Sequence, residues 1–175
     1  MPYLLDTNVF IQAKNLHYGF DFCPAFWDWL IEQNRAGNVY SIEKVRNELA
    51  AVADELSTWA AARGTGFFLR PNNATMQSLA AVSEWATGAG YDPSAVHTFL
   101  QDADYYLVAE GHARSYTVVT HELRSMSTKH IKLPNACEGV GVKFMTPFEM
   151  LRVERARFVL GPVPPAATQL ALPTP

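Results

Sequence analysis

The segment Tyr3-Leu4-Leu5-Asp6-Thr7-Asn8 gives the clearest indication of the fold in this chain of 175 residues. An apolar run this short, followed directly by polar residues, is typical of a buried parallel strand and the turn after it. We therefore predict a strand over residues 3–5, followed by a helix from Val9 to Lys14. The side chain of Thr7 or Asn8 can cap this helix.

Short apolar runs and helical segments alternate along the rest of the chain. Further strands are expected at residues 39–40, 67–69, 116–120 and 142–145, and further helices at 24–36, 42–53, 55–62, 74–87, 94–101, 103–113 and 147–158. This order predicts an α/β fold, a three-layer α/β/α sandwich around a mostly parallel central sheet of four to five strands. We assign residues 1–160 to a single domain and the proline-rich stretch 161–175 to a disordered tail.

The composition excludes several classes of protein. Hydrophobic residues make up 49% of the chain and charged residues 18%, which is too apolar for a disordered protein. A net charge of −3 argues against a strongly basic nucleic-acid binder. The two cysteines, Cys23 and Cys137, fit no metal or disulfide pattern and indicate buried thiols. With no signal peptide and no long apolar run, we expect a cytoplasmic protein that does not enter a membrane.

Three acidic residues lie where ligands usually bind in a parallel sheet. Asp6 directly follows the first strand, Glu122 follows the strand at 116–120, and Asp104 lies in the first turn of the helix at 103–113. Ligands of open α/β sheets bind beyond the carboxyl ends of the strands. We therefore expect Asp6 and Glu122 to project into one crevice, with Asp104 joining them.

The helix expected at 42–53 can supply a fourth acid. Glu43 and Glu48 are separated by about 140° around a helix, so they cannot both face one site. Glu48 shares a face with Val45 and Val52, which places it nearer the buried side, and we favour it. Asp102 is expected to cap the next helix, although it can also approach a metal through water.

Four carboxylates in one crevice repel each other unless a cation lies between them. Mg²⁺ and Mn²⁺ prefer oxygen ligands, and either ion can activate water for attack on a phosphodiester. The pattern therefore predicts a site for one or two Mg²⁺ or Mn²⁺ ions. Taken singly, each acid can equally be a helix cap or a solvated side chain.

Four segments, in this order, resemble those of PIN-domain nucleases: Tyr3–Ile11, Val45–Leu49, Ala103–Ala109 and Tyr116–Glu122. More narrowly, residues 3–158 resemble the DUF4411 branch of PIN-like proteins, through the segments 10–15, 26–30, 119–122 and 132–137. The resemblance implies a metal-dependent endoribonuclease that hydrolyses RNA, often the toxin of a bacterial type II toxin–antitoxin system. It also implies a cognate antitoxin as partner and a homodimer.

Carried over by position, the resemblance assigns the catalytic and metal-binding quartet to Asp6, Glu48, Asp104 and Glu122. Asn8 and Thr120 would support this quartet, with Asp102 beside it. Most PIN domains have aspartate where this chain has Glu122. Since glutamate is one methylene longer, we expect a shifted contact, or one through water, at a second metal position.

The stretch from Leu123 to Cys137 contains basic residues and no acid. We predict that Arg124, Lys129 and Lys132, with His130 nearby, bind RNA phosphates next to the site. The alternative is a solvated loop. Three arginines at 152, 155 and 157 are either a second basic patch or simply solvated side chains. The aromatic residues at 20–29 form either core or a groove for a partner.

Two other functions remain open from the sequence. One is a phosphatase of the haloacid-dehalogenase type, with Asp6 as the nucleophile. That chemistry needs a carboxylate two residues further on, where this chain has Asn8. The other is a non-catalytic PIN-like module that binds RNA or protein.

Overall fold

A computed structural model describes residues 1–159, and the tail predicted at 161–175 lies outside the described residues. Five strands form one sheet in the order β3-β2-β1-β4-β5. They are β1 (Tyr3–Leu5), β2 (Val39–Ile42), β3 (Phe68–Leu69), β4 (Thr117–Val119) and β5 (Phe144–Met145). All four pairings are parallel, which confirms the predicted α/β fold.

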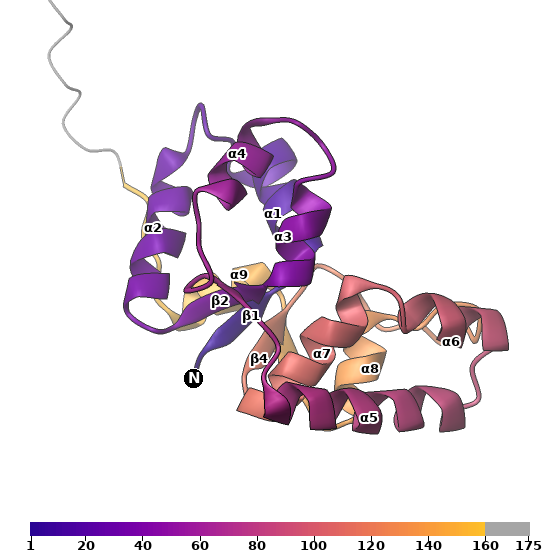
Figure 1. The fold of residues 1–175 in the computed structure, drawn as a ribbon. Helices are drawn as coiled ribbons and strands as arrows, with labels where there is room; N and C mark the ends of the chain where they lie inside the picture. Colours follow the sequence, from indigo (N-terminus) through magenta and orange to yellow (C-terminus); the bar gives the residue numbers. More distant parts are fainter. Residues whose placement is uncertain (160–175) are drawn as a thin grey trace, which may run out of the picture.

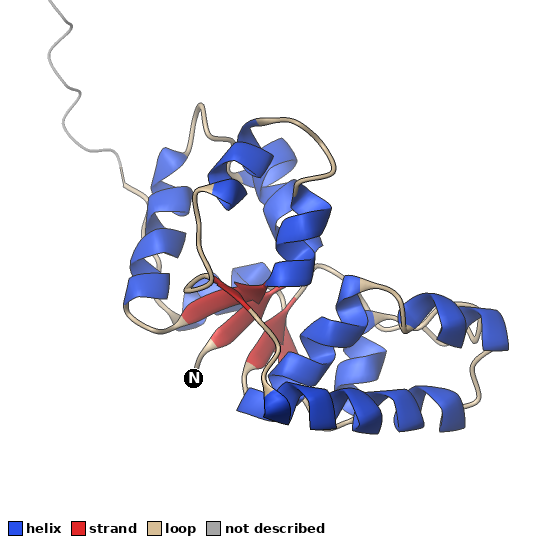
Figure 2. Cartoon of the chain, in the orientation of Figure 1, coloured by secondary structure: helices blue, strands red, loops and turns tan. Residues whose placement is uncertain are grey.

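Helices cover the sheet on both sides (Figures 1 and 2). They are α1 (Thr7–Gln12), the π-helix η1 (Ala13–His17), α2 (Pro24–Arg35), α3 (Glu43–Leu49), α4 (Glu55–Ala61), α5 (Asn73–Gly88), α6 (Pro93–Phe99), α7 (Ala103–Arg114), α8 (Leu133–Gly139) and α9 (Pro147–Val153). In Figure 1, α5, α7 and α8 lie together on one side of the sheet, and α2 and α9 lie on the other. Within residues 1–159, no helix is both long and apolar enough to cross a membrane.

The direction in which the chain winds changes between β1 and β4. The chain passes outward from β1 to β2 and β3, and then crosses back to β4 and β5 on the other side of β1. In an open parallel sheet, ligands bind at the carboxyl ends of the strands beside such a switch point. Asp6 and Thr120 are the residues that directly follow these two strands, and the Asp6 backbone N–H donates to Val119 O at 3.0 Å.

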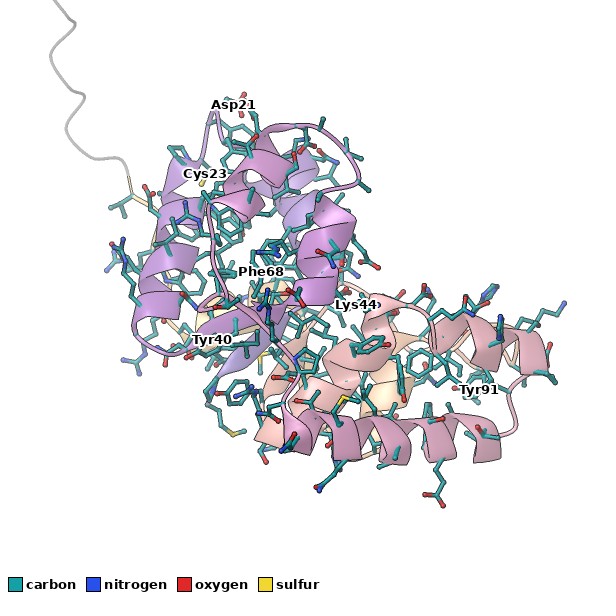
Figure 3. The ribbon with its side chains drawn as sticks, viewed as in Figure 1. Asp21, Cys23, Tyr40, Lys44, Phe68 and Tyr91 are labelled. Carbon is teal, nitrogen blue, oxygen red and sulfur yellow. The ribbon has the colours of Figure 1, made fainter. Side chains whose placement is uncertain are left out.

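The core forms where apolar side chains of the sheet meet the helices. Leu4, Leu5 and Val119 are fully buried in the central strands, and Leu107 of α7 is fully buried against them. Figure 3 shows side chains filling the space between helices and sheet, with Phe68 inside and Asp21 at the tip of the loop before α2. This buried layer fixes the positions of the strand ends.

Most helix boundaries differ from the sequence prediction by one or two residues, and three differences have a local structural reason. The first helix begins at Thr7, with extended Asp6 at its N-cap position, so neither Thr7 nor Asn8 caps it. The helix predicted at 42–53 ends at Leu49, and Asp54 then forms a capping box with Ser57 that begins the separate helix α4. The last helix ends at residue 153 instead of 158, since the chain turns through a left-handed residue at 155.

Two helices were not predicted. The segment 13–17 forms a π-helix, and α8 overlaps the end of the basic stretch 123–137, where no helix was predicted. The signal for α8 is the proline in its first turn together with buried Leu133, Ala136 and Cys137, which are three and four residues apart.

We expect Gly139→Ala to destabilise the fold by about 1–3 kcal/mol, because overpacking forces neighbours to move. A Cβ atom at Gly139 would overlap the indole ring of Trp85 on α5. Trp85 packs against Tyr91 and Phe99, with ring centroids 5.9 and 6.5 Å away, so its displacement loses further contacts. Urea denaturation measures the free energy of unfolding.

Gly88→Ala is the matched control for this prediction. A Cβ atom at Gly88, the last residue of α5, would meet nothing within 4 Å. We expect a change within about 0.5 kcal/mol for this surface substitution. Equal effects of the two variants would contradict the assigned packing of α8 on α5.

Candidate functional site

Thr120 connects the ends of the two central strands. Its hydroxyl donates to Asp6 Oδ2 at 2.7 Å and accepts from Asn8 Nδ2 at 3.1 Å. The backbone N–H of Glu122 donates to the same hydroxyl oxygen at 3.0 Å, and the His121 N–H donates to Asn8 Oδ1 at 3.0 Å. Asn8 and Thr120, predicted as supporting residues, therefore hold the Asp6 carboxylate in one orientation.

Asp6 lies at the bottom of the site, with only 4% of its surface exposed. Burial raises the pKa of this carboxyl group from 3.8 to about 6, against the lowering effect of the Thr120 hydrogen bond. The nearby charges of Glu122 and Glu48 raise this pKa further. Asp6 is therefore an acid whose charge is poorly stabilised by the protein alone.

Asp104 lies in the first turn of α7 and is half-buried. Within residues 1–159, no donor forms a hydrogen bond to its carboxylate. Burial raises its pKa to about 8, and the negative charges of four other acids add to this shift: Asp6, Glu122, Asp102 and Glu48. The structure thus brings the four predicted acids close enough to repel one another.

Glu122 is the acid that the protein neutralises directly. Lys132 Nζ lies 2.7 Å from Glu122 Oε1, and the Leu133 backbone N–H donates to Glu122 Oε2 at 2.8 Å. Both donors belong to the start of α8. The hydrogen bond to Glu122 raises the pKa of the Lys132 ammonium group. Because α8 was not predicted, this contact was missed by sequence reasoning.

Glu48 and Glu43 lie on different sides of α3. Glu48 accepts a hydrogen bond from the Thr7 hydroxyl, next to Asp6, whereas Glu43 pairs with Arg70 Nε at 2.9 Å. The preference for Glu48 thus agrees with its placement in the structure. The argument from burial was wrong, however, because Glu48 is exposed and Val52 lies beyond the helix with 62% of its surface exposed.

A cavity of about 330 Å³ opens beside Asp104 and Glu122. Asp102, Asp104 and Glu122 line it, and so do Lys129 and Lys132 from the basic stretch, together with His130. Asp102 occupies the N-cap position of α7, as predicted, but its side chain makes no capping hydrogen bond. The cavity therefore places carboxylates beside cationic side chains.

Arg124 lies apart from the other predicted RNA-binding residues. It lines a second cavity of about 470 Å³, which shares Glu122 with the first. Its guanidinium group pairs with Glu138 at 3.1 Å and lies over the ring of Phe144, with the centroid 5.3 Å away. Cavities therefore lie on both sides of Glu122.

The donor atoms at the site are those that a hard cation prefers, namely carboxylate, hydroxyl and amide oxygens. Within residues 1–159, no group of three or more His, Cys, Asp or Glu side chains is arranged to hold a metal ion. Mg²⁺ commonly binds through one or two carboxylates and retains several waters. Asp6 and Asp104 fit this mode, since neither has a cationic partner among the described residues and each has a raised pKa.

Cys137 lies fully buried in α8 behind the acids. Burial raises the pKa of its thiol, and the charges of Asp104 and Asp6 act in the same direction. The thiolate form is therefore disfavoured at this position. The prediction of buried thiols is thus confirmed for Cys137, whereas Cys23 is only partly buried.

A model of one protein family, described as "Domain of unknown function (DUF4411)", matches residues 3–158. The match covers most of the chain and includes every acid of the site. No curated protein and no solved structure matches the chain.

We expect Asp104→Asn to stabilise the metal-free protein at pH 8 by about 1–2 kcal/mol. In the folded protein the pKa of Asp104 is about 8, well above its ordinary value of 3.8. The folded state therefore holds this proton more tightly than the unfolded chain does, and stability falls as the pH rises from about 4 to 8. Asparagine carries no charge and avoids this loss.

Urea denaturation in EDTA at pH 5 and pH 8 measures the effect. The advantage of Asp104→Asn should shrink towards pH 5, and Asp28→Asn, at an exposed position on α2, should show none at either pH. A gain that is the same at both pH values would contradict the assigned electrostatic cause.

Proposed function

We propose that this chain, which belongs to the DUF4411 family, is a metal-dependent endoribonuclease that hydrolyses RNA phosphodiester bonds. The observation that carries the proposal is the pair Asp6 and Asp104, two poorly compensated acids. Asp104 also lines a cavity with basic side chains. Their place at the switch point of a parallel sheet and the resemblance to PIN-domain nucleases support the same function.

One or two Mg²⁺ or Mn²⁺ ions would be held by Asp6 and Asp104, with Glu122 and Glu48 contributing directly or through water. When bound, such an ion activates water and neutralises the charge that develops on the phosphodiester. Thr120 fixes the direction of the Asp6 carboxylate by its hydrogen bond of 2.7 Å. Asn8 fixes Thr120 in turn, so the acid keeps its place when substrate arrives.

The basic residues give a polyanion a way to approach the acids. Lys129 and His130 are exposed at the rim of the 330 Å³ cavity, and Lys132 lies deeper, against Glu122. Lysine and histidine side chains at such a rim bind backbone phosphates without reading the base sequence. This arrangement favours RNA over a small uncharged substrate.

The phosphatase alternative is less well supported by the geometry. A haloacid-dehalogenase-like enzyme needs a free acid–base group at position 8, and this chain has asparagine there. Asn8 uses its amide nitrogen on Thr120 and its amide oxygen on the His121 N–H. Its side chain therefore supports the site and does not transfer protons.

We also propose a biological role for this nuclease, as the toxin of a bacterial type II toxin–antitoxin system. The resemblance to PIN-domain nucleases supports it, together with the antitoxin partner and the homodimer that it implies. Exposed apolar side chains at Ile11, Leu16 and Val52 offer surface for such a protein partner.

We expect Asp6→Asn to lower RNA cleavage by at least about a hundredfold, because it removes a charged ligand from the site. The assay follows labelled single-stranded RNA with Mn²⁺, Mg²⁺ or EDTA. Wild-type cleavage should need the metal, and Asp104→Asn should match Asp6→Asn. Asp28→Asn, an exposed variant on α2, should retain wild-type activity.

Full cleavage by Asp6→Asn would overturn the proposal. If the wild type shows neither metal-dependent cleavage nor Mn²⁺ binding by calorimetry, the non-catalytic binding module is the better description.

We expect Lys129→Ala to reduce the salt dependence of RNA binding, with a slope of log K against log salt that is smaller by about 0.7. Lys143→Ala is the control, since Lys143 precedes β5 at the opposite end of the sheet. Fluorescence anisotropy at several salt concentrations in EDTA gives both slopes. Equal slopes for Lys129→Ala and Lys143→Ala would contradict the predicted contact between the basic stretch and RNA phosphates.

A further inference from the structure

A groove of about 350 Å³ runs along α9, apart from the cavities beside the carboxylates. Aromatic and arginine side chains dominate its lining, namely Tyr18, Phe148, Phe158, Arg152, Arg155 and Arg157. All three arginines are exposed, and within residues 1–159 none of them forms an ion pair. We call this surface the arginine groove.

The two acids of α9 do not neutralise these arginines by ion pairing. Glu149 accepts hydrogen bonds from the Thr146 backbone N–H at 2.7 Å and hydroxyl at 2.8 Å, in a capping box. The end of the helix carries Glu154, which accepts from the Tyr3 hydroxyl at 2.6 Å. The arginine groove therefore keeps a positive charge and attracts an anionic ligand.

The aromatic floor of the groove is held rigidly from below. Tyr18 stacks on Phe26 with ring centroids 4.4 Å apart, and Phe158 packs against both rings at 5.7 and 6.1 Å. The Trp27 indole N–H also donates to the Tyr18 carbonyl oxygen at 2.7 Å. A floor that is already ordered loses little conformational entropy when a ligand binds.

Three rings connect the arginine groove to the acids. His17, His121 and Phe148 pack against one another with centroids 5.2 to 5.6 Å apart, and we call them the aromatic bridge. His121 lies between Thr120 and Glu122 in the chain, next to the candidate site. Phe148 lines the groove and has 36% of its surface exposed. A chain of packed rings therefore leads from the groove to the residue beside Glu122.

Arg155 adopts a backbone conformation that glycine favours. Its φ is +52°, at the turn where the Ala156 N–H donates to Leu151 O at 2.9 Å and α9 ends. Glycine is usual at this position after a helix, because a Cβ atom is strained there. Ser115 adopts the same conformation after α7, so replacement by glycine relieves strain at either position.

We propose that the arginine groove and the aromatic bridge bind a single-stranded segment of RNA that extends away from the cleavage site. Unstacked bases pack on Phe148 and its neighbouring rings, and the arginines bind the phosphates. The inference rests on the proposed function for its choice of RNA as ligand. Since bases in a duplex are already stacked, the surface prefers single strands.

The experiment measures binding of a labelled single-stranded RNA of roughly a dozen nucleotides by anisotropy, in EDTA, so that no cleavage intervenes. Arg155→Gly should weaken binding about threefold to tenfold and reduce the salt slope by about 0.7. Its melting temperature should rise by roughly 1–4 °C, since the strain is removed. Weaker binding then cannot be a consequence of unfolding.

Ser115→Gly is the matched control. Ser115 also has a positive φ, +57°, but it follows α7 and lines a different cavity. The melting temperature of this variant should rise by a similar amount, and its affinity for RNA should equal that of the wild type.

Phe148→Leu tests the aromatic bridge while keeping an apolar side chain of similar bulk. We expect its affinity for single-stranded RNA to fall about fivefold, the lower end for loss of one base–aromatic stack. The wild type should bind a duplex of the same sequence more weakly than the single strand, and Phe148→Leu should not change the affinity for the duplex.

Wild-type affinity in both Arg155→Gly and Phe148→Leu would overturn the inference, as would equal binding of duplex and single strand. Displacement of RNA by oligoglutamate from the wild type but not from Arg155→Gly, with unchanged RNA affinity in that variant, would instead assign the groove to an acidic peptide. The proposed function is tested separately by Asp6→Asn and metal, so either idea can fail alone.

Discussion

The hydroxyl group of Thr120 is the point on which the candidate site depends. A hydroxyl has one proton to donate and two lone pairs to accept with, and here all three are used. The hydroxyl donates a hydrogen bond to the Asp6 carboxylate, and its lone pairs accept hydrogen bonds from the Asn8 amide nitrogen and the Glu122 backbone N–H. These partners come from the ends of β1 and β4, which are neighbours only because the chain reverses its winding there. The topology of the sheet therefore also determines the orientation of the acids.

The acids at this edge are stabilised unequally. Glu122 has a lysine and a backbone N–H, and Glu48 has the Thr7 hydroxyl. Asp104 is half-buried and, within residues 1–159, accepts no hydrogen bond. A protein that used these residues only for folding would gain by replacing Asp104 with a neutral side chain. A bound cation is the simplest compensation, which is why the distribution of charge supports the proposed chemistry.

Local patterns in the sequence predicted the parts of the fold that are determined locally. The apolar run at 3–5 and the polar turn after it identified β1 and Asp6, and the angle between Glu43 and Glu48 separated their positions correctly. The start of α8 was missed because its helical signal is short, and its contact with Glu122 joins residues ten or eleven positions apart. The Thr120–Asp6 contact joins residues 114 positions apart and could be inferred only from strand order.

Arg155 occupies a position where folding stability would favour a different residue. A positive side chain near the end of a helix gains from the helix dipole, by about 0.3–1 kcal/mol. Arg152, in the last turn of α9, already supplies that charge without a left-handed backbone. Stability alone would therefore favour glycine at position 155, as at Gly141, where φ is also positive. Arg155 is exposed and forms no ion pair among the described residues, so its guanidinium group is available to the RNA segment that we propose for the groove. The aromatic rings lead from the groove to His121, the chain neighbour of Glu122, which supports our proposal that one RNA molecule occupies both the groove and the candidate site.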